Sequence, residues 1–422
     1  MARVFTPIDA SAILAATVRE ATGQELTLQS INTTNFASIG ETLLTTGKEN
    51  VLNALSTVLF RDIIAVRPYT AKFKTLRPIS TDLFEQRVRK ISYYAKDPKA
   101  SGAFNTNLWE NFKDGYTNGQ NIDSNGVAHS TKSMWEQDPP IPLEKFFGGS
   151  SVWADSYQVY EVQLDAAFRS PEALAKFANG YIQEKMNDIE SQKEAFARLN
   201  LLNYIAGVAD QSSRMPGSFR NLTTEYNTKF NPSPALTTQD LLTTHFKEFL
   251  EFFVETVKTD IDRLSNRSAL YHDAMTQTID GIDYSILRHT PTNKMRALMY
   301  APFWNAAEAR VLPEIFHEGM LSLENFEKVT FWQNEANSSA IDVIPAVWDN
   351  NTGTQIAGNQ VQLDYVIGTI HDIDALMVDF QLERVASTPL EARKLYRNIW
   401  YNMARNNICD FTEKGIVYYM AD

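Results

Sequence analysis

The stretch that decides the fold covers residues 170–208 and reads SPEALAKFANGYIQEKMNDIESQKEAFARLNLLNYIAGV. It opens with Ser170 as a helix N-cap, a proline at the first helical position and an acid in the first turn. Apolar residues then recur at steps of three and four, which indicates one continuous amphipathic helix. Unbroken, this helix would be roughly 50 Å long at ~1.5 Å per residue. We interpret it either as an ordinary long core helix or as a spine to which other parts attach.

The composition limits the class of protein. The chain has 422 residues, of which 44% are hydrophobic and 21% charged, as is ordinary for a folded globular protein. The net charge of −12 argues against a nucleic-acid reader with a broad basic surface, but not against a protein that encloses nucleic acid. Cys409 is the single cysteine, so no intrachain disulfide is possible. We expect neither a membrane helix nor a signal peptide, because no apolar run has the length or the position for one.

The N-terminal part of the chain predicts an arm. Residues 1–47 are low in charge and are expected to lie on other parts rather than to fold as a unit. Within them, residues 10–21 favour a short helix, whereas residues 27–46 show no sustained period. Residues 48–66 have helical spacing of their apolar side chains and end before a proline, so we expect a helix over residues 48–68.

A long two-stranded ribbon is predicted over residues 69–168. Its outgoing part, residues 72–99, carries eight basic and three acidic side chains and alternates as a strand does. Its returning part, residues 151–168, is acidic, so we expect the two parts to pair through cross-strand charges. The connection is rich in turn signals and aromatic residues, which is typical of a loop that contacts another protein. The candidate inter-subunit contact residues are Arg87, Arg89, Lys90, Trp109, Trp135, Asp155 and Glu161.

The second half of the chain mixes helix and strand patterns. A polar connector over residues 211–236 precedes a second amphipathic helix over residues 237–264. Residues 294–318 predict short strands or a loop edge. Strands are expected over residues 326–332, 340–348, 361–369, 376–385, 395–403 and 415–420. For residues 395–403 the alternative is a helix over residues 390–405.

No catalytic motif is evident. The six histidines are scattered, and none stands three or four residues from another. Signatures of phosphate-binding loops, dinucleotide sites, zinc proteases and serine hydrolases are missing from the sequence. The pairs 317–318 and 371–372, each a histidine followed by an acid, resemble fragments of a metal or triad site, but surface or turn histidines are the simpler interpretation. Asp372 and Asp374 have a metal-like spacing, for which a helix cap or a tight turn is the simpler interpretation. Asp260, Asp262 and Asp283 are interpreted as a solvated helix end and a turn. We therefore predict no catalytic residue, no metal site and no cofactor.

Taken in order, these parts resemble the major capsid proteins of tailed bacteriophages, the family with the Hong Kong 97-type fold. In sequence the resemblance rests on residues 366–376 (VIGTIHDIDAL), similar to a strand-turn segment, and on residues 410–417 (DFTEKGIV), similar to a closing strand. It implies an α+β fold with six parts. These are the N-terminal arm (1–47), an N-terminal helix (48–68), the extended ribbon or E-loop (69–168), the spine helix of the P-domain (169–210), the A-domain (211–320), and the A-domain remainder with the C-terminal P-domain strands (321–422).

The resemblance also implies a function. It predicts a structural protein, not an enzyme, that self-assembles as pentamers and hexamers into the icosahedral head of a tailed phage. A separate scaffolding protein is expected, because the sequence has no long charged helical extension at its N-terminus. Portal and decoration proteins are the other implied partners. Double-stranded DNA would be enclosed without specific binding and without a membrane, in a virion assembled in the host cytoplasm.

Two other functions stay open at this point. An encapsulin, the shell of a bacterial compartment, has the same fold, although the long loop and the N-terminal arm suit a larger shell. A cytoplasmic enzyme or ligand-binding protein would instead hold a site in a cleft between the helices and the C-terminal sheet. The enzyme hypothesis predicts a compact monomer, whereas the capsid hypothesis predicts an L-shaped subunit with arms.

Overall fold

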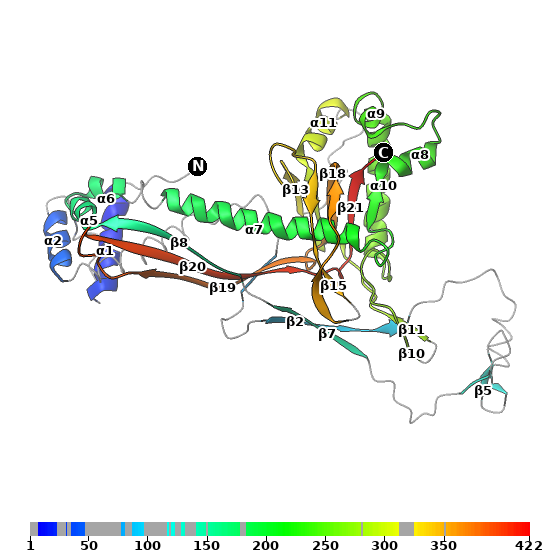
Figure 1. Ribbon diagram of the computed structural model, residues 1–422, viewed down its shortest axis with the longest axis horizontal. Helices are drawn as coiled ribbons and strands as arrows, with labels where there is room; N and C mark the ends of the chain where they lie inside the picture. The colour runs from blue at the N-terminus through cyan, green and yellow to red at the C-terminus, as the bar shows by residue number, and fades with distance from the viewer. Residues whose placement is uncertain are drawn as a thin grey trace.

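The chain forms an L-shaped molecule, as the capsid hypothesis predicts. A long arm meets an upright lobe, and a two-stranded ribbon leaves from near the corner (Figure 1). None of the helices described combines the length and the apolar character of a membrane span. The computed structural model describes residues 7–22, 31, 35–46, 77–80, 87–96, 116–117, 120–122, 128–130, 141–148, 151–177, 183–279, 282–311, 325–349 and 352–422.

The decisive stretch forms two helices, α6 (Pro171–Phe177) and α7 (Gln183–Asp210). Ser170 caps α6 as predicted, because its Oγ accepts a hydrogen bond from the Ala173 backbone N–H at 3.1 Å. Residues 178–182 lie outside the described residues, so the prediction of one unbroken helix is not tested there. α7 runs along the arm into the upright lobe, as a spine would (Figure 1).

The arm is built on a four-stranded sheet in the order β1-β19-β20-β8. Its strands are β1 (Arg77–Ser80), β8 (Ser151–Tyr160), β19 (Leu376–Ser387) and β20 (Tyr396–Cys409). β8, β20 and β19 pair antiparallel, whereas β1 lies parallel to β19. α7 covers one face of this sheet, where Ile189 packs against Tyr401 and Met403.

The N-terminal helices pack at the far end of the arm. They are α1 (Pro7–Thr22) and α2 (Phe36–Thr46), which join α5 (Glu161–Ala167) and α6 around a second apolar core. α1 confirms the helix predicted over residues 10–21. α2 corrects the view that residues 27–46 have no regular pattern. Its buried positions, Phe36, Gly40 and Leu43, cover only two turns and include a glycine, so the period is too short to detect.

The upright lobe surrounds a five-stranded sheet in the order β13-β12-β18-β21-β9. The strands are β9 (Phe219–Asn221), β12 (Met295–Tyr300), β13 (Asn325–Val329), β18 (Tyr365–Asp372) and β21 (Gly415–Met420). The helices are α8 (Leu222–Phe230), α9 (Thr238–Thr243), α10 (Phe246–Ser265) and α11 (Ala301–Val311). The end of α7 packs with them in the main apolar core, which contains Phe249, Phe253 and Trp332.

Several short elements complete the described chain. Two hairpin-like pairs stand beside the end of α7: β14 (Ile341–Val343) with β17 (Val361–Leu363), and β15 (Ala346–Asp349) with β16 (Thr354–Ala357). The others are β3 (Ala95–Lys96), β10 (Gln277–Ile279) and β11 (Ile282–Ser285) in one sheet, β4 (Tyr116–Thr117), β5 (Gln120–Ile122) and β6 (Ala128–Ser130) in another, and a 3-10 turn at Thr292–Lys294.

The ribbon differs from its prediction in the returning strand. β2 (Arg87–Tyr93) pairs antiparallel with β7 (Pro142–Gly148), not with residues 151–168. Residues 151–160 form β8 of the arm sheet, and α5 takes up most of the rest. The reason is burial, because Val159 of β8 is 2% exposed in the second core of the arm. Burying one face of a strand specifies its partner more strongly than complementary surface charge does.

Most predictions for the second half of the chain are confirmed. Residues 237–264 are helical, with a break at Thr244 and His245 between α9 and α10, and Thr237 forms a capping box with Asp240. Strand structure is present in all four segments predicted between residues 326 and 385, but 340–348 is divided into β14 and β15, 361–369 into β17 and the start of β18, and β16 was not predicted. β20 confirms the strand interpretation of residues 395–403, so the alternative helix is wrong there.

Two predictions in this half are corrected. The supposed connector over residues 211–236 contains β9 and α8, and residues 301–311 form α11 instead of strands or a loop edge. In α11 the buried side chains Phe303, Trp304 and Ala307 are spaced three and four residues apart on one face. A pattern confined to so few turns was overlooked beside the neighbouring strand signals. The helix predicted over residues 48–68 lies outside the described residues.

Candidate functional site

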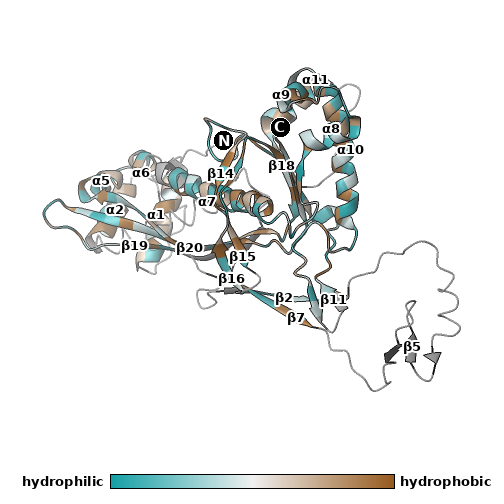
Figure 2. Cartoon of the chain, turned by 45° about the vertical axis from the view of Figure 1, so that its right-hand side comes forward, coloured by the Kyte–Doolittle hydropathy of each residue, from teal (hydrophilic) through white to brown (hydrophobic). Residues whose placement is uncertain are grey.

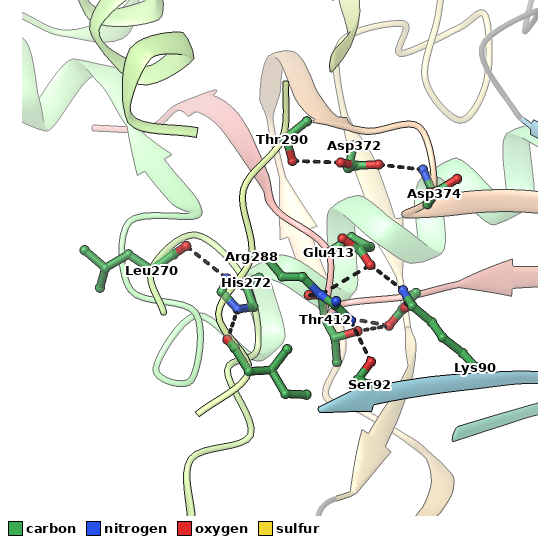
Figure 3. A network of polar contacts seen from close by, with 12 residues as sticks. Lys90, Ser92, Leu270, His272, Arg288, Thr290, Asp372, Asp374, Thr412 and Glu413 are labelled. Carbon is green, nitrogen blue, oxygen red and sulfur yellow. Dashed lines mark hydrogen bonds and ion pairs between the residues drawn. The ribbon is translucent and has the colours of Figure 1, made fainter. Parts of the chain in front are cut away.

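A short turn between β20 and β21 lies where the arm, the upright lobe and the ribbon meet. This turn covers residues 410–415 and reads DFTEKG (Figure 3). The Asp410 backbone N–H donates to the Ala375 carbonyl at 2.8 Å, and the Gly415 N–H donates to the Tyr271 carbonyl at 2.9 Å. Within the turn, Thr412 donates from its N–H and its hydroxyl to Asp410 Oδ1, at 3.0 and 2.7 Å. These bonds hold the turn in one conformation.

Lys90 of β2 anchors the ribbon to this turn. Its Nζ donates to Asp410 Oδ2 and to Glu413 Oε1 (Figure 3). The Asp410 side chain is fully buried and that of Glu413 is 11% exposed, so these ion pairs are largely shielded from water. Arg288 completes the group, because its Nε lies 3.4 Å from Glu413 Oε1 and its Nη2 donates to Ser92 Oγ of β2 at 2.6 Å.

The two carboxylates of the anchor have different electrostatics. Burial favours the neutral form of Asp410, but Lys90 and Lys145 outweigh burial and lower the pKa of Asp410 to about 2. For Glu413 burial dominates and raises the pKa, although Lys90 and Arg288 act in the opposite direction. Burial lowers the pKa of Lys90, but the two carboxylates overcome this effect and the pKa is raised. Lys90 and Asp410 are therefore the firmly charged pair of the anchor.

A second lysine faces inward from the partner strand. Lys145 of β7 is 5% exposed, and its Nζ lies 5.1 Å from the centroid of the Trp348 ring. That distance is typical of a cation–π contact. Burial lowers the pKa of Lys145, and the opposing effects of Asp410 and Asp273 are smaller. Because Trp348 belongs to β15, the inner face of the ribbon rests on this hairpin as well as on the turn.

The opposite face of the ribbon is open. Side chains alternate across a strand, so the residues that do not face the turn point outward. Ile91, Tyr93 and Phe146 are 45%, 59% and 47% exposed, and Arg89 pairs with Glu144 across the two strands. We call these five residues the outer ribbon face. Figure 2 shows the ribbon standing apart from the arm and the lobe, with hydrophobic residues along β7. Exposed apolar side chains beside a satisfied ion pair suit a contact with protein.

Phe411 joins the turn to the spine helix. Its ring stacks on that of Tyr204 of α7, with centroids 5.8 Å apart and planes 6° apart. The ring occupies the space where a side chain of Gly207 would lie, since a Cβ at that position would overlap it. Only glycine at this point of α7 lets the aromatic ring approach so closely.

Lys414 joins the turn to the end of α10. Its Nζ donates to the Asn266 carbonyl at 2.6 Å, to Ser268 Oγ at 2.9 Å and to the Arg263 carbonyl at 3.4 Å. A cation at a helix C-terminus satisfies carbonyl groups that have no partner within the helix. Burial lowers the pKa of Lys414 to about 8.

The predicted contact residues of the ribbon are placed on β2 or lie outside the described residues. Arg89 belongs to the outer ribbon face, whereas Lys90 is turned inward to the anchor. Arg87 begins the same strand. Trp109 and Trp135 lie outside the described residues. Contacts of these residues with another subunit remain predictions.

The other two predicted contact residues lie in the arm. Asp155 is on β8 and Glu161 begins α5, so the structure separates both from the ribbon with which they were expected to pair. Sequence reasoning missed Lys145, Glu144 and Phe146, because they lie just before the segment taken for the returning strand. Residues 142–148 read PLEKFFG, where two charged residues and two phenylalanines stand in adjacent pairs, so no period-two pattern marks this segment as a strand.

The polar residues considered for chemistry have structural roles. Asp260 was expected at a solvated helix end, but it is fully buried, and Arg220 and the Tyr418 hydroxyl donate to it, the latter at 2.9 Å. The interpretation was wrong because Asp260 lies on the buried stripe of α10, between Val257 and Leu264. Among the residues described, no group of three or more histidine, cysteine or acidic side chains is arranged to hold a metal ion.

Residues 373–375 form a tight turn after β18, as preferred for the Asp372–Asp374 spacing, but His371 lies in the buried end of β18 and not at the surface or in a turn. The pair at residues 317–318 lies outside the described residues. Asp372 accepts hydrogen bonds from the Thr290 hydroxyl at 2.8 Å and from the Asp374 N–H at 2.9 Å (Figure 3). His371 is fully buried, and burial lowers its pKa to about 3, so the ring is neutral. Nothing in this segment resembles an acid–base pair.

Comparison with known proteins identifies the fold. No protein-family model and no curated protein matches the chain. A chain of the capsid structure of Staphylococcus phage Andhra matches it with a TM-score of 0.50 and 12% identity, over 83% of this chain and 84% of that one. A chain of the structure of the head fiber and inner core protein gp22 of native bacteriophage P68 matches with a TM-score of 0.48 and 12% identity, over 82% and 83%. The protein thus shares its mixed helix-and-sheet fold with a chain of a phage capsid structure, over most of the length of both.

Proposed function

We propose that this chain is the major capsid protein of a tailed bacteriophage, which assembles into the icosahedral head around double-stranded DNA. The observation that carries the proposal is the outer ribbon face. Its apolar side chains are 45–59% exposed on a ribbon that a buried ionic anchor holds out from the body. A lone subunit leaves this face in water, whereas a neighbouring subunit in a shell would cover it. The fold shared with a chain of the phage Andhra capsid structure supports the same conclusion.

The parts of the molecule then take distinct roles. The β2–β7 ribbon is the E-loop, the arm with α7 is the P-domain, and α1 and α2 belong to the N-terminal arm. The upright lobe is the A-domain, which meets its copies around five-fold and six-fold axes. In this proposal β8 and α5 join the P-domain instead of the E-loop, because β8 pairs with β20. The arms make heterologous contacts between copies, and such contacts close into rings when the rotation between copies allows it.

The partners follow from this role. The chain contacts copies of itself in pentamers and hexamers, a separate scaffolding protein during assembly, and portal and decoration proteins in the finished head. The net charge of −12 keeps the shell from gripping the packaged DNA, which stays mobile. The protein is structural and has no enzymatic step, and it resides in the virion after assembly in the host cytoplasm.

Assembly of the purified chain tests the proposal. The chain is expressed with and without a co-expressed scaffolding protein, and its size is measured by size-exclusion chromatography and sedimentation. Pentamers, hexamers, tubes or closed shells support the proposal. A compact monomer under every condition would refute it and would return attention to a ligand-binding cleft. A particle of small diameter that contains a cargo enzyme would identify an encapsulin instead.

A further inference from the structure

The 410–415 turn contacts three different parts of the molecule. Asp410 and Glu413 hold Lys90 of the ribbon, Phe411 lies against α7, and Lys414 holds the end of α10. The residue that contacts the spine helix thus lies in sequence between the two residues that hold the ribbon. Because all three are carried by the same short backbone segment, movement of the ribbon is expected to displace the contact with the spine helix.

We propose that the 410–415 turn couples the ribbon to the spine helix. The ribbon stays bound to the turn as long as Phe411 packs against α7, and Phe411 stays packed there as long as Lys90 is paired with the turn. This inference concerns the single subunit and does not rest on the proposed function.

The turn is expected to move as a rigid unit, because the carboxylate of Asp410 is hydrogen-bonded to the backbone of the same turn. Thr412 donates two hydrogen bonds to Asp410 Oδ1, while Lys90 occupies Asp410 Oδ2. The carbonyl of Phe411, which lies between them, accepts a hydrogen bond from the Asp273 N–H at 2.7 Å. Any movement of the Asp410 carboxylate with Lys90 thus shifts the backbone that carries the Phe411 ring.

Close packing of the Phe411 ring against α7 fixes the position of the turn. The Phe411 ring is stacked on Tyr204 and fills the space above Gly207. At the other end of the turn the Tyr204 hydroxyl lies against Gly415, where a Cβ would overlap it. The spine helix therefore touches both ends of the turn, and a shift of a fraction of an ångström opens a gap or creates an overlap.

Loss of Lys90 destabilises the turn on its charged side. Without Lys90, the fully buried Asp410 keeps the Thr412 donors and the more distant charge of Lys145, and Glu413 keeps Arg288. A buried carboxylate that loses its hydrogen-bonded cation is destabilised unless it regains water or changes its position. Displacement of the ribbon, which carries Lys90, therefore also rearranges the turn. Because coupling between sites is reciprocal, displacement of Phe411 loosens the ribbon to a similar extent.

Hydrogen exchange of the unassembled full-length chain tests the coupling from the ribbon side. Lys90→Met keeps the length of the side chain and removes its charge. We expect it to speed amide exchange in β2 and β7 and, at least fivefold, in residues 201–208 of α7. The matched control is Arg89→Met on the same strand, which breaks only the exposed pair with Glu144 and is expected to leave α7 unchanged. Faster exchange in the ribbon with wild-type exchange in residues 201–208 would overturn the proposal.

The converse variant tests the coupling from the spine helix. Phe411→Leu removes the stacking on Tyr204 and is expected to speed exchange in β2 and β7 at least fivefold. Phe253→Leu is the control, because Phe253 lies in the same main core but packs on Phe303 and Tyr418 away from the turn. It is expected to leave the ribbon unchanged, and an equal effect of both leucine variants on the ribbon would refute the coupling. If Phe411→Leu does not fold, the result for Lys90→Met decides by itself.

Discussion

Removal of apolar side chains from the outer ribbon face should weaken assembly by more than removal of equally exposed side chains elsewhere on the subunit. Phe146 is 47% exposed and Ile91 is 45% exposed, so about half of each side chain is available for burial against a neighbour. Full burial of such a side chain contributes about 1.5–3 kcal/mol, so half of it contributes about 1 kcal/mol per residue. The double variant with Phe146→Ser and Ile91→Ser therefore loses about 2 kcal/mol per contact. Since 1.4 kcal/mol is a factor of ten, the protein concentration needed for assembly should rise about 30-fold.

Light scattering against protein concentration measures this threshold, and thermal unfolding of the free subunit checks the fold. The unfolding temperature is expected to fall modestly, because the half of each side chain that the subunit already buries is removed as well. Ile356→Ser is the matched control, since Ile356 on β16 is also 45% exposed but lies outside the outer ribbon face. An unchanged threshold in the double variant, with particles still formed, would refute the assignment of this face to a subunit contact.

Three further predictions concern the interior. Gly207→Ala should lower the free energy of unfolding by about 2 kcal/mol in denaturant titration. Overlap of the added methyl group with the Phe411 ring costs about 3 kcal/mol, which outweighs the ~1 kcal/mol gain in helix propensity. Equal or higher stability would show that the Phe411 ring is not tightly packed against α7. Asp260→Ala should cost about 2–3 kcal/mol in the same titration, because the buried Tyr418 hydroxyl loses its charged acceptor and Arg220 keeps only Glu225 of its two carboxylates. Asp262→Ala on the exposed side of the helix should change little, and similar effects of the two would contradict the burial argument. The pKa of Asp410 is lowered from 3.8 to about 2, so its contribution is complete above pH 3.8 and is lost as the pH falls toward 2. Exchange in β2, corrected for its intrinsic pH dependence, should therefore rise most steeply below about pH 4. A rise that is complete above about pH 5 would point to Glu413, whose pKa is raised, and would exclude Asp410 as the titrating group.

Elements whose signals lie within their own sequence could be predicted. The cap at Ser170 and the capping box at Thr237 depend on neighbours within a few residues. The single apolar stripe expected for α7 differs from the structure, where Leu199 is exposed and residues 204–208 are buried on all sides of the helix. The closing strand over residues 415–420 is likewise bounded by a glycine and dense in β-formers, and the structure has it with those limits. Helices such as α2 and α11 were missed because their buried faces are only two or three turns long.

Pairing between distant segments could not be predicted. The acidic segment after residue 150 matched the basic strand in charge, but β7 is the partner of β2, and among the side chains described the Arg89–Glu144 pair links the two strands by charge. Surface charges stabilise weakly, so they do not decide which strands meet. The anchor shows the same difficulty, because Lys90 and Asp410 are 320 positions apart. Residues 410–417 were noticed for their resemblance, but no local pattern reveals that their two acids bind the ribbon.

The central claim is that copies of this chain build a shell through the arms that the subunit extends. Electron microscopy of the purified chain, alone and with its scaffolding protein, tests this claim most directly. We predict closed particles whose surface shows five-fold and six-fold clusters of upright lobes, with the ribbon of each subunit lying on a neighbour. Particles without such clusters, or a chain that remains a dispersed monomer at every concentration and salt condition, would contradict it.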